Sequence, residues 1–296
     1  MYLSEDTLVK WTKRSSQNET DKQEYTVSQI RAAILSDATL EKMYRNDDLS
    51  IYTKGSYANN TNVRLDSDVD VVVERTDLFY FGTVAPYTRV SSSPYTGPWT
   101  EESFWQAVQK ALVNYFDYNA VDTTGNSSIQ IDTDHRMNIH ADVVPCSKYK
   151  LYFSDTMAYE GTRLKKQDGT IAINYPAIQK EKGNLKNNQT GRRYKRVVRI
   201  IKRLENEMVK SGYCDEVPSY LLECLVYNCD NRFFEHLTYK DTLVAILHCI
   251  ADGLINSDNE SWTEPNEIKL LFAENQKWNL SDALRFIAAA LKFVQE

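Results

Sequence analysis

A pair of aspartates at the head of a β-branched run constrains this chain more than any other feature. Asp68-Val69-Asp70 opens the run, which continues to Val73. Side chains alternate along a strand, so both carboxylates lie on the same face. Two carboxylates that point the same way need a strong counter-charge if both are to stay ionised. Mg²⁺ suits this role because it binds through one or two carboxylates and keeps waters and substrate phosphates as its other ligands. The pattern therefore predicts metal and phosphate chemistry at the start of a strand.

Two further motifs fit that prediction. Gly55-Ser56 lies upstream and supplies a tight turn whose backbone N–H groups and hydroxyl are suited to cradle a triphosphate. Asp142 lies in a second alternating segment, and we expect it to be the third carboxylate. Three carboxylates can hold two ions about 4 Å apart, one activating an attacking hydroxyl and one steadying a leaving group. The plainer alternative for the aspartate pair, two solvated side chains on an edge strand, is disfavoured because the flanking valines indicate burial.

Composition excludes several other classes of protein. The chain has 296 residues and a formal net charge of −6, which argues against a general nucleic-acid-binding surface because phosphate backbones require a basic footprint. No apolar run approaches the roughly 20 residues of a membrane span. The five cysteines form no C-x-x-C pair. Together with the lack of a signal-peptide pattern, they indicate reduced thiols in a cytoplasmic protein with no membrane partner.

The two halves of the chain differ in their predicted secondary structure. The front half mixes helices with short strands, and the segment 79–98 is predicted to be a long loop. The back half contains helical patterns throughout. We therefore predict an α+β fold of two lobes, residues 1–175 and 176–296, with an active-site cleft between them. The predicted helices of the front half are 4–13, 21–35 and 101–115, and its strands are 50–54, 68–74, 128–131 and 137–144. The helices of the back half are 192–210, 219–227, 242–255 and 281–294.

Basic and hydroxyl side chains in the helical half are candidates for phosphate binding. Lys195, Arg199 and Lys202 share one helix face by their spacing. For most basic residues of this helix a solvated face is the better interpretation, but Lys202 is our candidate for a β- or γ-phosphate contact. Ser219 begins the next predicted helix, where an N-terminus and a hydroxyl favour an anion, and Tyr220 beside it could stack on a base. An ordinary helix cap is the alternative there.

These motifs together resemble a known family. They stand in the order that is typical of the polymerase-β-type nucleotidyltransferase superfamily. More narrowly, the chain is similar to the bacterial CD-NTases, the relatives of animal cyclic GMP–AMP synthase and of DncV, and within them to the CdnE-like clade E. The resemblance covers most of the chain and rests on five segments, Gly55-Ser56-Tyr57-Ala58, Asp68-Val69-Asp70, Ala141-Asp142-Val143-Val144-Pro145, Arg199-Ile200-Ile201-Lys202 and Pro218-Ser219-Tyr220-Leu221-Leu222-Glu223.

The resemblance implies a fold and a set of site residues. The fold is a two-lobed, polymerase-β-like nucleotidyltransferase with a mixed β-sheet catalytic lobe and a helical lobe that completes the nucleotide-binding cleft. The catalytic Mg²⁺ ligands are Asp68, Asp70 and Asp142, and Mn²⁺ can substitute. The nucleotide-binding residues are Gly55 and Ser56 for the triphosphate, Lys202 and Ser219 to grip it from the helical lobe, Tyr220 to stack on a base and Asn174 to read a base edge. An asparagine offers both a donor and an acceptor, and in some clade-E-like members it accompanies use of a pyrimidine nucleotide.

The implied activity is synthesis of a cyclic oligonucleotide, in particular a cyclic dinucleotide, by two sequential Mg²⁺-dependent nucleotidyl transfers that release pyrophosphate. The substrates are ribonucleoside triphosphates, ATP with UTP or GTP, and the product signals to a downstream effector in bacterial anti-phage defence. The chain has no Cys/His-rich insertion, so activation by double-stranded DNA is not expected. Two alternatives stay open. A single-transfer nucleotidyltransferase that modifies a protein, a tRNA or a small molecule would carry the same aspartates, and a silent nucleotide sensor is disfavoured by their presence.

Overall fold

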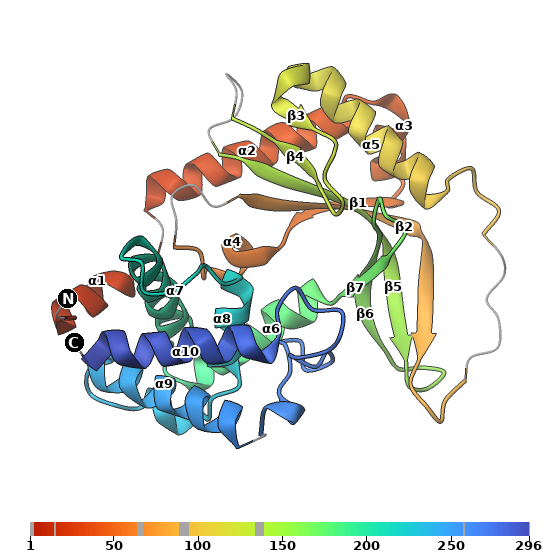
Figure 1. The fold of residues 1–296 in the computed structure, drawn as a ribbon. Coiled ribbons are helices and arrows are strands. Elements are labelled where there is room, and N and C mark those ends of the chain that lie inside the picture. The colour runs from red at the N-terminus through yellow and green to blue at the C-terminus, as the bar shows by residue number, and fades with distance from the viewer. Residues whose placement is uncertain are drawn as a thin grey trace. The chain divides into compact units, whose positions relative to one another are not determined.

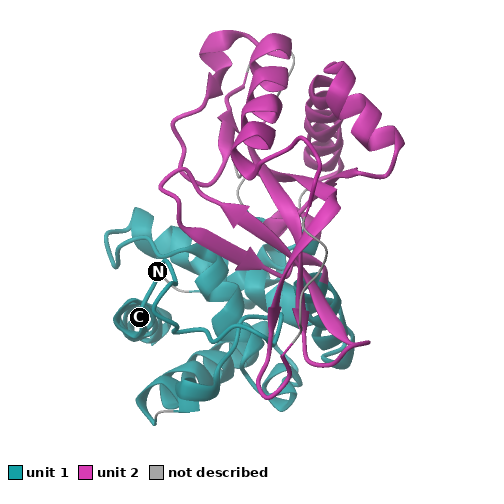
Figure 2. Ribbon diagram, turned by 90° about the vertical axis from the view of Figure 1, so that its right-hand side faces the viewer, with its two compact units in different colours: residues 1–15, 59–63, 178–296 teal, residues 16–58, 64–177 magenta. Residues whose placement is uncertain are grey.

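The computed structural model describes residues 3–14, 16–63, 68–88, 95–133, 139–256 and 258–295 (Figure 1). The chain divides into two compact units (Figure 2). The sheet unit consists of residues 16–58 and 64–177, and the helical unit of residues 1–15, 59–63 and 178–296. The predicted α+β class is confirmed, since one unit is built on a mixed sheet and the other on helices. The first helix, α1 (Glu5–Trp11), and the segment 59–63 belong with the C-terminal helices.

The described strands of the sheet unit form one mixed sheet. Five of them follow the order β1-β2-β5-β4-β3, while β6 pairs with the far part of β5, and β7 pairs with β6. Only the pair of β2 and β5 is parallel among the described ladders. The bounds are β1 Leu49–Thr53, β2 Val69–Thr83, β3 Val121–Asp122, β4 Ile129–Ile131, β5 Ala141–Tyr152, β6 Ala158–Lys165 and β7 Ile171–Asn174.

The two central strands are longer than the sequence pattern predicts. β2 runs on to Thr83, so the prediction of a loop from residue 79 is wrong for 79–83. After a bulge beyond Arg75, the aromatic residues 79–81 continue the parallel ladder opposite residues 148–150 of β5. β5 likewise continues past Pro145 to Tyr152. Residues 89–94 of the predicted loop and 137–138 of the predicted strand lie outside the described residues.

Helices α2 (Gln17–Leu35) and α5 (Glu101–Tyr115) pack on each other and on the sheet, α2 against β2 and α5 against β5. Both begin with reciprocal side-chain caps, which satisfy backbone N–H groups that a helix start leaves unpaired. Apolar residues at helical spacing, among them Ile30, Ile34 and Leu112, join the strand valines in one core. The other short elements of this part of the chain are α3 (Ala38–Arg45), α4 (Gly55–Asn59) and the 3₁₀ turn Tyr118–Ala120.

The helical unit has a core of its own. Its central helix, α7 (Tyr194–Lys210), buries the predicted apolar stripe against α9 (Tyr239–Ile255) and α10 (Leu280–Gln295). The stripe includes Val197, Ile201 and Leu204. The sequence analysis did not predict α6 (Pro176–Gln189), which is polar along most of its length. The remaining helices are α8 (Ser219–Tyr227), α9 (Tyr239–Ile255) and α10 (Leu280–Gln295), with 3₁₀ turns at Asn231–Phe234 and Asp258–Ser261. Among the described helices, none is both long and apolar enough to cross a bilayer.

Candidate active site

The Gly55-Ser56 turn lies directly against the second aspartate of the Asp-x-Asp pair. Gly55 has a φ of +72°, a left-handed conformation that favours glycine. A Cβ at this position would lie 3.0 Å from Cγ of Asp70 and closer still to Oδ2. The backbone N–H of Lys54, just before the turn, donates to the carbonyl oxygen of Asp70 at 3.1 Å. The two motifs, which are separate in sequence, therefore meet at the carboxylate of Asp70, and only a residue without a side chain permits this approach.

The strand register brings Asp142 beside Asp70. The two residues are Cα partners in the parallel ladder of β2 and β5. Partner residues on neighbouring strands, which lie about 4.8 Å apart, point to the same face of a sheet. Asp68 comes just before β2, and the N–H of Val69 donates to the carbonyl of His140 at 2.9 Å, which holds this strand start next to β5. Asp68 is exposed, while Asp70 and Asp142 are half-buried.

Asp142 is oriented by a residue that the sequence analysis missed. The hydroxyl of Ser128, just before β4, donates to Oδ1 of Asp142 at 3.1 Å. In the antiparallel ladder of β4 and β5, the residue directly opposite Asp142 is Gln130. Only Gln130 is the ladder partner of Asp142, and Ser128 reaches it from the residue before β4, so neither contact can be found without the register of β4 and β5.

A cavity of about 350 Å³ lies at this edge of the sheet unit. Asp68 and Asp142 line it together with Asp122, Asp132 and His140, none of which the sequence pattern singled out. His140 pairs through Nδ1 with Asp132. Backbone and hydroxyl groups of Thr124 donate to Asp122 and lower the pKa of its carboxyl group. The other lining residues are Asn119, Ala120, Gln130, Ile131 and Ala141. The cavity therefore presents mainly acidic and amide oxygens.

This donor set is chemically suited to Mg²⁺. Within the described residues, no three acidic, histidine or cysteine side chains converge into a ready-made ion cage. Mg²⁺ does not require such a cage, because it takes one or two carboxylates and completes its octahedron with water and substrate phosphate oxygens. Asp70 and Asp142 supply carboxylates on one face of adjacent strands, and Asp68 supplies a third at the strand start.

In the helical unit, Lys202 is buried together with an acidic partner. Its Nζ lies 3.5 Å from Oε2 of Glu223, and both side chains are at most 5% exposed. The same carboxylate oxygen accepts a hydrogen bond of 2.7 Å from the hydroxyl of Thr61. This network fixes the side chain of Lys202 against Glu223, the fifth residue of α8. Ser219, the first residue of α8, is exposed, and no side-chain hydrogen bond caps this helix start.

Tyr220 and Asn174 occupy well-defined positions. The hydroxyl of Tyr220 donates to Oε2 of Glu264 at 3.1 Å, and its ring packs edge-to-face on Trp278. Asn174 ends β7, where it is the ladder partner of Thr162 and is half-buried. Base stacking by Tyr220 and base reading by Asn174 stay predictions, as do the roles of the other site residues.

Comparison with known proteins gives a consistent result. Residues 181–295 match the family model described as the cGAS/DncV-like nucleotidyltransferase C-terminal helical domain. The chain is 34% identical over 298 residues to a cyclic dipyrimidine nucleotide synthase, CdnE, of Legionella pneumophila, which covers 99% of this chain and 98% of that protein. It is 32% identical over 299 residues to a cyclic dipurine nucleotide synthase of Elizabethkingia meningoseptica, over 97% of each chain.

A solved structure agrees with these relatives. The c-UMP-AMP synthase CdnE of Rhodothermus marinus, solved with Apcpp and Upnpp, superimposes with a TM-score of 0.81 at 28% identity, and the match covers 99% of this chain and 97% of that one. The similarity in sequence and in structure thus extends over both units rather than over one motif.

Proposed function

Because this chain is a member of the CD-NTase family of nucleotidyltransferase enzymes, we propose that it is a cyclic dinucleotide synthase that joins two ribonucleoside triphosphates. The observation that carries the proposal is the meeting of the Gly55-Ser56 turn with Asp70, beside Asp142 in the next strand. A turn that can hold phosphate and carboxylates that can hold Mg²⁺ are the two parts that nucleotidyl transfer requires. The names of the relatives support the same activity.

In the proposed reaction, a ribose hydroxyl of one nucleotide attacks the α-phosphate of the other. One P–O bond forms, the bond between the α-phosphate and pyrophosphate breaks, and the proton of the hydroxyl passes to water. Bound Mg²⁺ would ease the loss of this proton and offset negative charge on the leaving pyrophosphate. Asp68, Asp70 and Asp142 would hold the ions. Asp142 would be nearest the attacking hydroxyl, and Ser128 orients the carboxylate of Asp142. A second transfer within the linear intermediate closes the ring. Catalysis of this kind consists mostly of positioning and charge stabilisation.

The chain's other candidate residues have separate tasks in this proposal. Ser56 and the amides of its turn hold the triphosphate. In the helical unit, Lys202 and Ser219 contribute phosphate contacts and Tyr220 contributes a stacking ring, while Asn174 of the sheet unit contacts a base edge. In the structure the ammonium group of Lys202 is buried and contacts Glu223, so a phosphate must compete with that carboxylate for it. The substrates we propose are ATP with UTP or GTP, and the cyclic product would act in the bacterial cytoplasm on a downstream effector of anti-phage defence.

The test is product analysis with the pure protein. Incubation with Mg²⁺ and the four ribonucleoside triphosphates, followed by phosphatase and mass spectrometry, should reveal a phosphatase-resistant cyclic product. Asp68→Asn/Asp70→Asn should remove at least 99% of it. The matched control is Asp21→Asn/Asp252→Asn, two exposed helix residues in the same chain, which should retain full activity. A folded Asp68/Asp70 variant that still makes product would refute the metal assignment. If a radiolabelled nucleotide instead transfers its label to an added protein or tRNA, the result would favour a single-transfer enzyme.

A further inference from the structure

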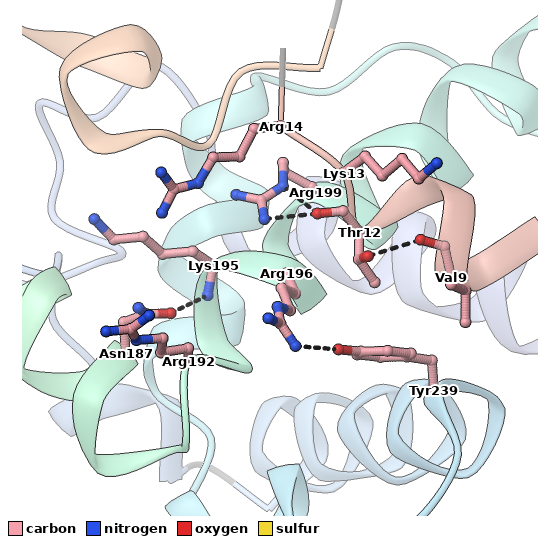
Figure 3. Close-up of a pocket in the computed structure, with 10 residues that line it drawn as sticks. All are labelled: Val9, Thr12, Lys13, Arg14, Asn187, Arg192, Lys195, Arg196, Arg199 and Tyr239. Atoms are coloured by element: carbon pink, nitrogen blue, oxygen red, sulfur yellow. Dashed lines mark hydrogen bonds between the residues drawn. The ribbon is translucent and has the colours of Figure 1, made fainter. Parts of the chain in front are cut away.

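A second cavity, of about 580 Å³, lies entirely within the helical unit (Figure 3). It is formed by the end of α1 and the residues that follow, the last turn of α6 and the turn after it, the first turns of α7 and the start of α9. We call it the basic pocket, and its lining residues are Val9, Thr12, Lys13, Arg14, Asn187, Arg192, Lys195, Arg196, Arg199 and Tyr239. Its volume is in the range of small-molecule sites, about 300–1,000 Å³. Lys202, Ser219 and Tyr220, the phosphate and base contacts proposed for this unit, do not line it.

The charge of the basic pocket is strongly positive. Six of its ten lining residues are lysine or arginine, and none of these ten described residues is acidic. Figure 3 shows the side chains of Arg14 and Lys195 reaching into the same space from different segments of the chain. This concentration is unusual in a chain whose net charge is −6. A solvated basic helix face is the ordinary reason for such a cluster, but it would not bring Lys13 and Arg14, which follow α1, around one hollow with the cations of α7 and of the turn before it.

Two of these cations are buried, and their described hydrogen bonds go to neutral acceptors. Arg199 is 3% exposed and donates to the carbonyl oxygens of Thr12 and Asn60. Lys195 is 6% exposed and donates to Oδ1 of Asn184 at 2.6 Å. Carbonyl and amide oxygens hold these groups in place without cancelling their charge. The positive potential of the pocket is therefore left for a ligand to neutralise.

The pKa values support this interpretation. Burial, together with the nearby charges of Arg14, Arg203 and Arg196, lowers the pKa of Arg199 to about 10. Burial also lowers the pKa of Lys195, and the charges of Arg14, Lys180 and Arg199 add to the effect, although Glu223 opposes it. The cations therefore repel one another in the described structure, and a bound anion would relieve that repulsion.

Two residues at one wall of the basic pocket have a left-handed backbone conformation, and one of them is the cationic Arg192. Gly191 and Arg192 both have positive φ values, 57° and 64°. Glycine adopts this conformation without strain, but a residue with a Cβ pays roughly 1–2 kcal/mol. The turn is held by a hydrogen bond of 2.6 Å from the N–H of Arg192 to the carbonyl of Asn187, which also lines the pocket. Such outliers concentrate at ligand-binding sites.

We propose that the basic pocket binds a compact polyphosphate, a ligand with three or more linked phosphate groups. A single phosphate carries at most two charges, whereas six cations surround this cavity, so a chain of phosphates matches the charge better. An extended nucleic acid is disfavoured because its backbone needs a basic surface along its length, and these cations converge on one hollow. The ligand is either inorganic polyphosphate or the phosphate tail of a nucleotide. This inference does not depend on the proposed catalytic activity.

The test is calorimetric titration with inorganic tripolyphosphate in buffer that contains EDTA, which keeps metal-dependent binding at the aspartates out of the measurement. The wild-type protein should bind at one site. Arg14→Glu/Arg192→Glu, which changes two exposed lining residues, should weaken binding at least tenfold. Lys10→Glu/Lys210→Glu makes the same change of net charge at exposed residues outside the pocket and should bind like the wild type. Arg14→Ala/Arg192→Ala provides a milder variant, and thermal unfolding checks that each variant is folded.

The outcomes are distinct. Binding of ATP at the same site, more tightly than tripolyphosphate, would identify a nucleotide as the ligand, whereas equal or weaker binding would identify free polyphosphate. No binding by the wild type at millimolar tripolyphosphate would overturn the proposal, as would equal binding by the Arg14/Arg192 variant. An RNA duplex that binds through Arg14 and Arg192 when tripolyphosphate does not would also overturn it. Asp68→Asn/Asp70→Asn should retain tripolyphosphate binding, which separates failure of this site from failure of the proposed synthase.

Discussion

Gly55→Ala tests the proposed metal site without removing any of its ligands. A Cβ at residue 55 would lie 3.0 Å from Cγ of Asp70 and nearer still to Oδ2, inside the distance that real Cβ atoms keep. The carboxylate is the far end of a side chain, so it can move and the fold can survive. A displacement of about 1 Å in a catalytic group is enough to reduce a rate on the order of 100-fold. We therefore expect the formation of cyclic product, measured as an initial rate at saturating nucleotide and Mg²⁺, to fall about 100-fold.

The strain of the left-handed backbone must be separated from the collision. Gly212 has nearly the same φ, +71° against +72°, but nothing lies within 4 Å of a Cβ built there. Both alanine variants should lose roughly 1–2 kcal/mol of stability from the φ value alone, which lowers the melting temperature by about 2–4 °C for each kcal/mol. Only Gly55→Ala should lose activity. A Gly55→Ala enzyme within threefold of the wild-type rate, or an equal loss in Gly212→Ala, would refute the reasoning.

Three further predictions concern a buried ion pair, a buried carboxyl group and the metal ion. Glu223→Ala leaves Lys202 buried without its partner and Thr61 without its acceptor, so urea unfolding should show a loss of about 3–5 kcal/mol; a loss below 1 kcal/mol would contradict this. Burial raises the pKa of Glu74 from 4.5 to about 7. As pH rises, the unfolded chain therefore loses this proton at a lower pH than the folded protein does, and the free energy of unfolding should fall between about pH 4.5 and about pH 7. Glu74→Gln should reduce that fall between pH 5 and pH 8, and an unchanged pH dependence would exclude Glu74 as its cause. EDTA should abolish product formation, and added Mg²⁺ or Mn²⁺ should restore it, whereas turnover in EDTA would contradict a metal-dependent reaction.

The sequence pattern predicts an element correctly where burial of one apolar face determines it. The valines after Asp68 are buried in a central strand, as their β-branched run predicts, and the apolar stripe of α7 forms the centre of the helical core. In both cases the period of the pattern matches the geometry of one element, and the burial follows from it. The sequence predicts Asp142 as a third carboxylate but not that it lies beside Asp70. That pairing depends on the strand register, which is set by contacts between distant segments.

Tertiary context decided the features that the sequence analysis missed. Pro145 indicates the end of a strand, because proline cannot donate to a ladder. In the structure β4 pairs with residues 141–143 of β5 and β6 pairs from Ser147 onwards, so Pro145 falls between the two ladders on that side. The strand can therefore continue through it. The glycine, proline and serine residues that follow the aromatic residues 79–81 predict a loop there, yet β5 offers these aromatic residues a parallel partner.

Base selection depends on much less of the chain than the fold does. Relatives with 34% and 32% identity carry the names of a dipyrimidine and a dipurine synthase, so overall identity does not determine which bases are joined. A site that is built to hydrogen-bond one base edge can reject another through a few unpaired polar groups. Asn174 meets the structural requirement for such a group, because its backbone is fixed by pairing with Thr162 and by a close approach to Gly161, where a Cβ would lie 2.6 Å from the carbonyl of Asn174. A rigid strand end presents its side chain in one place, which is what the base-reading role proposed for the amide of Asn174 requires of its donor and acceptor.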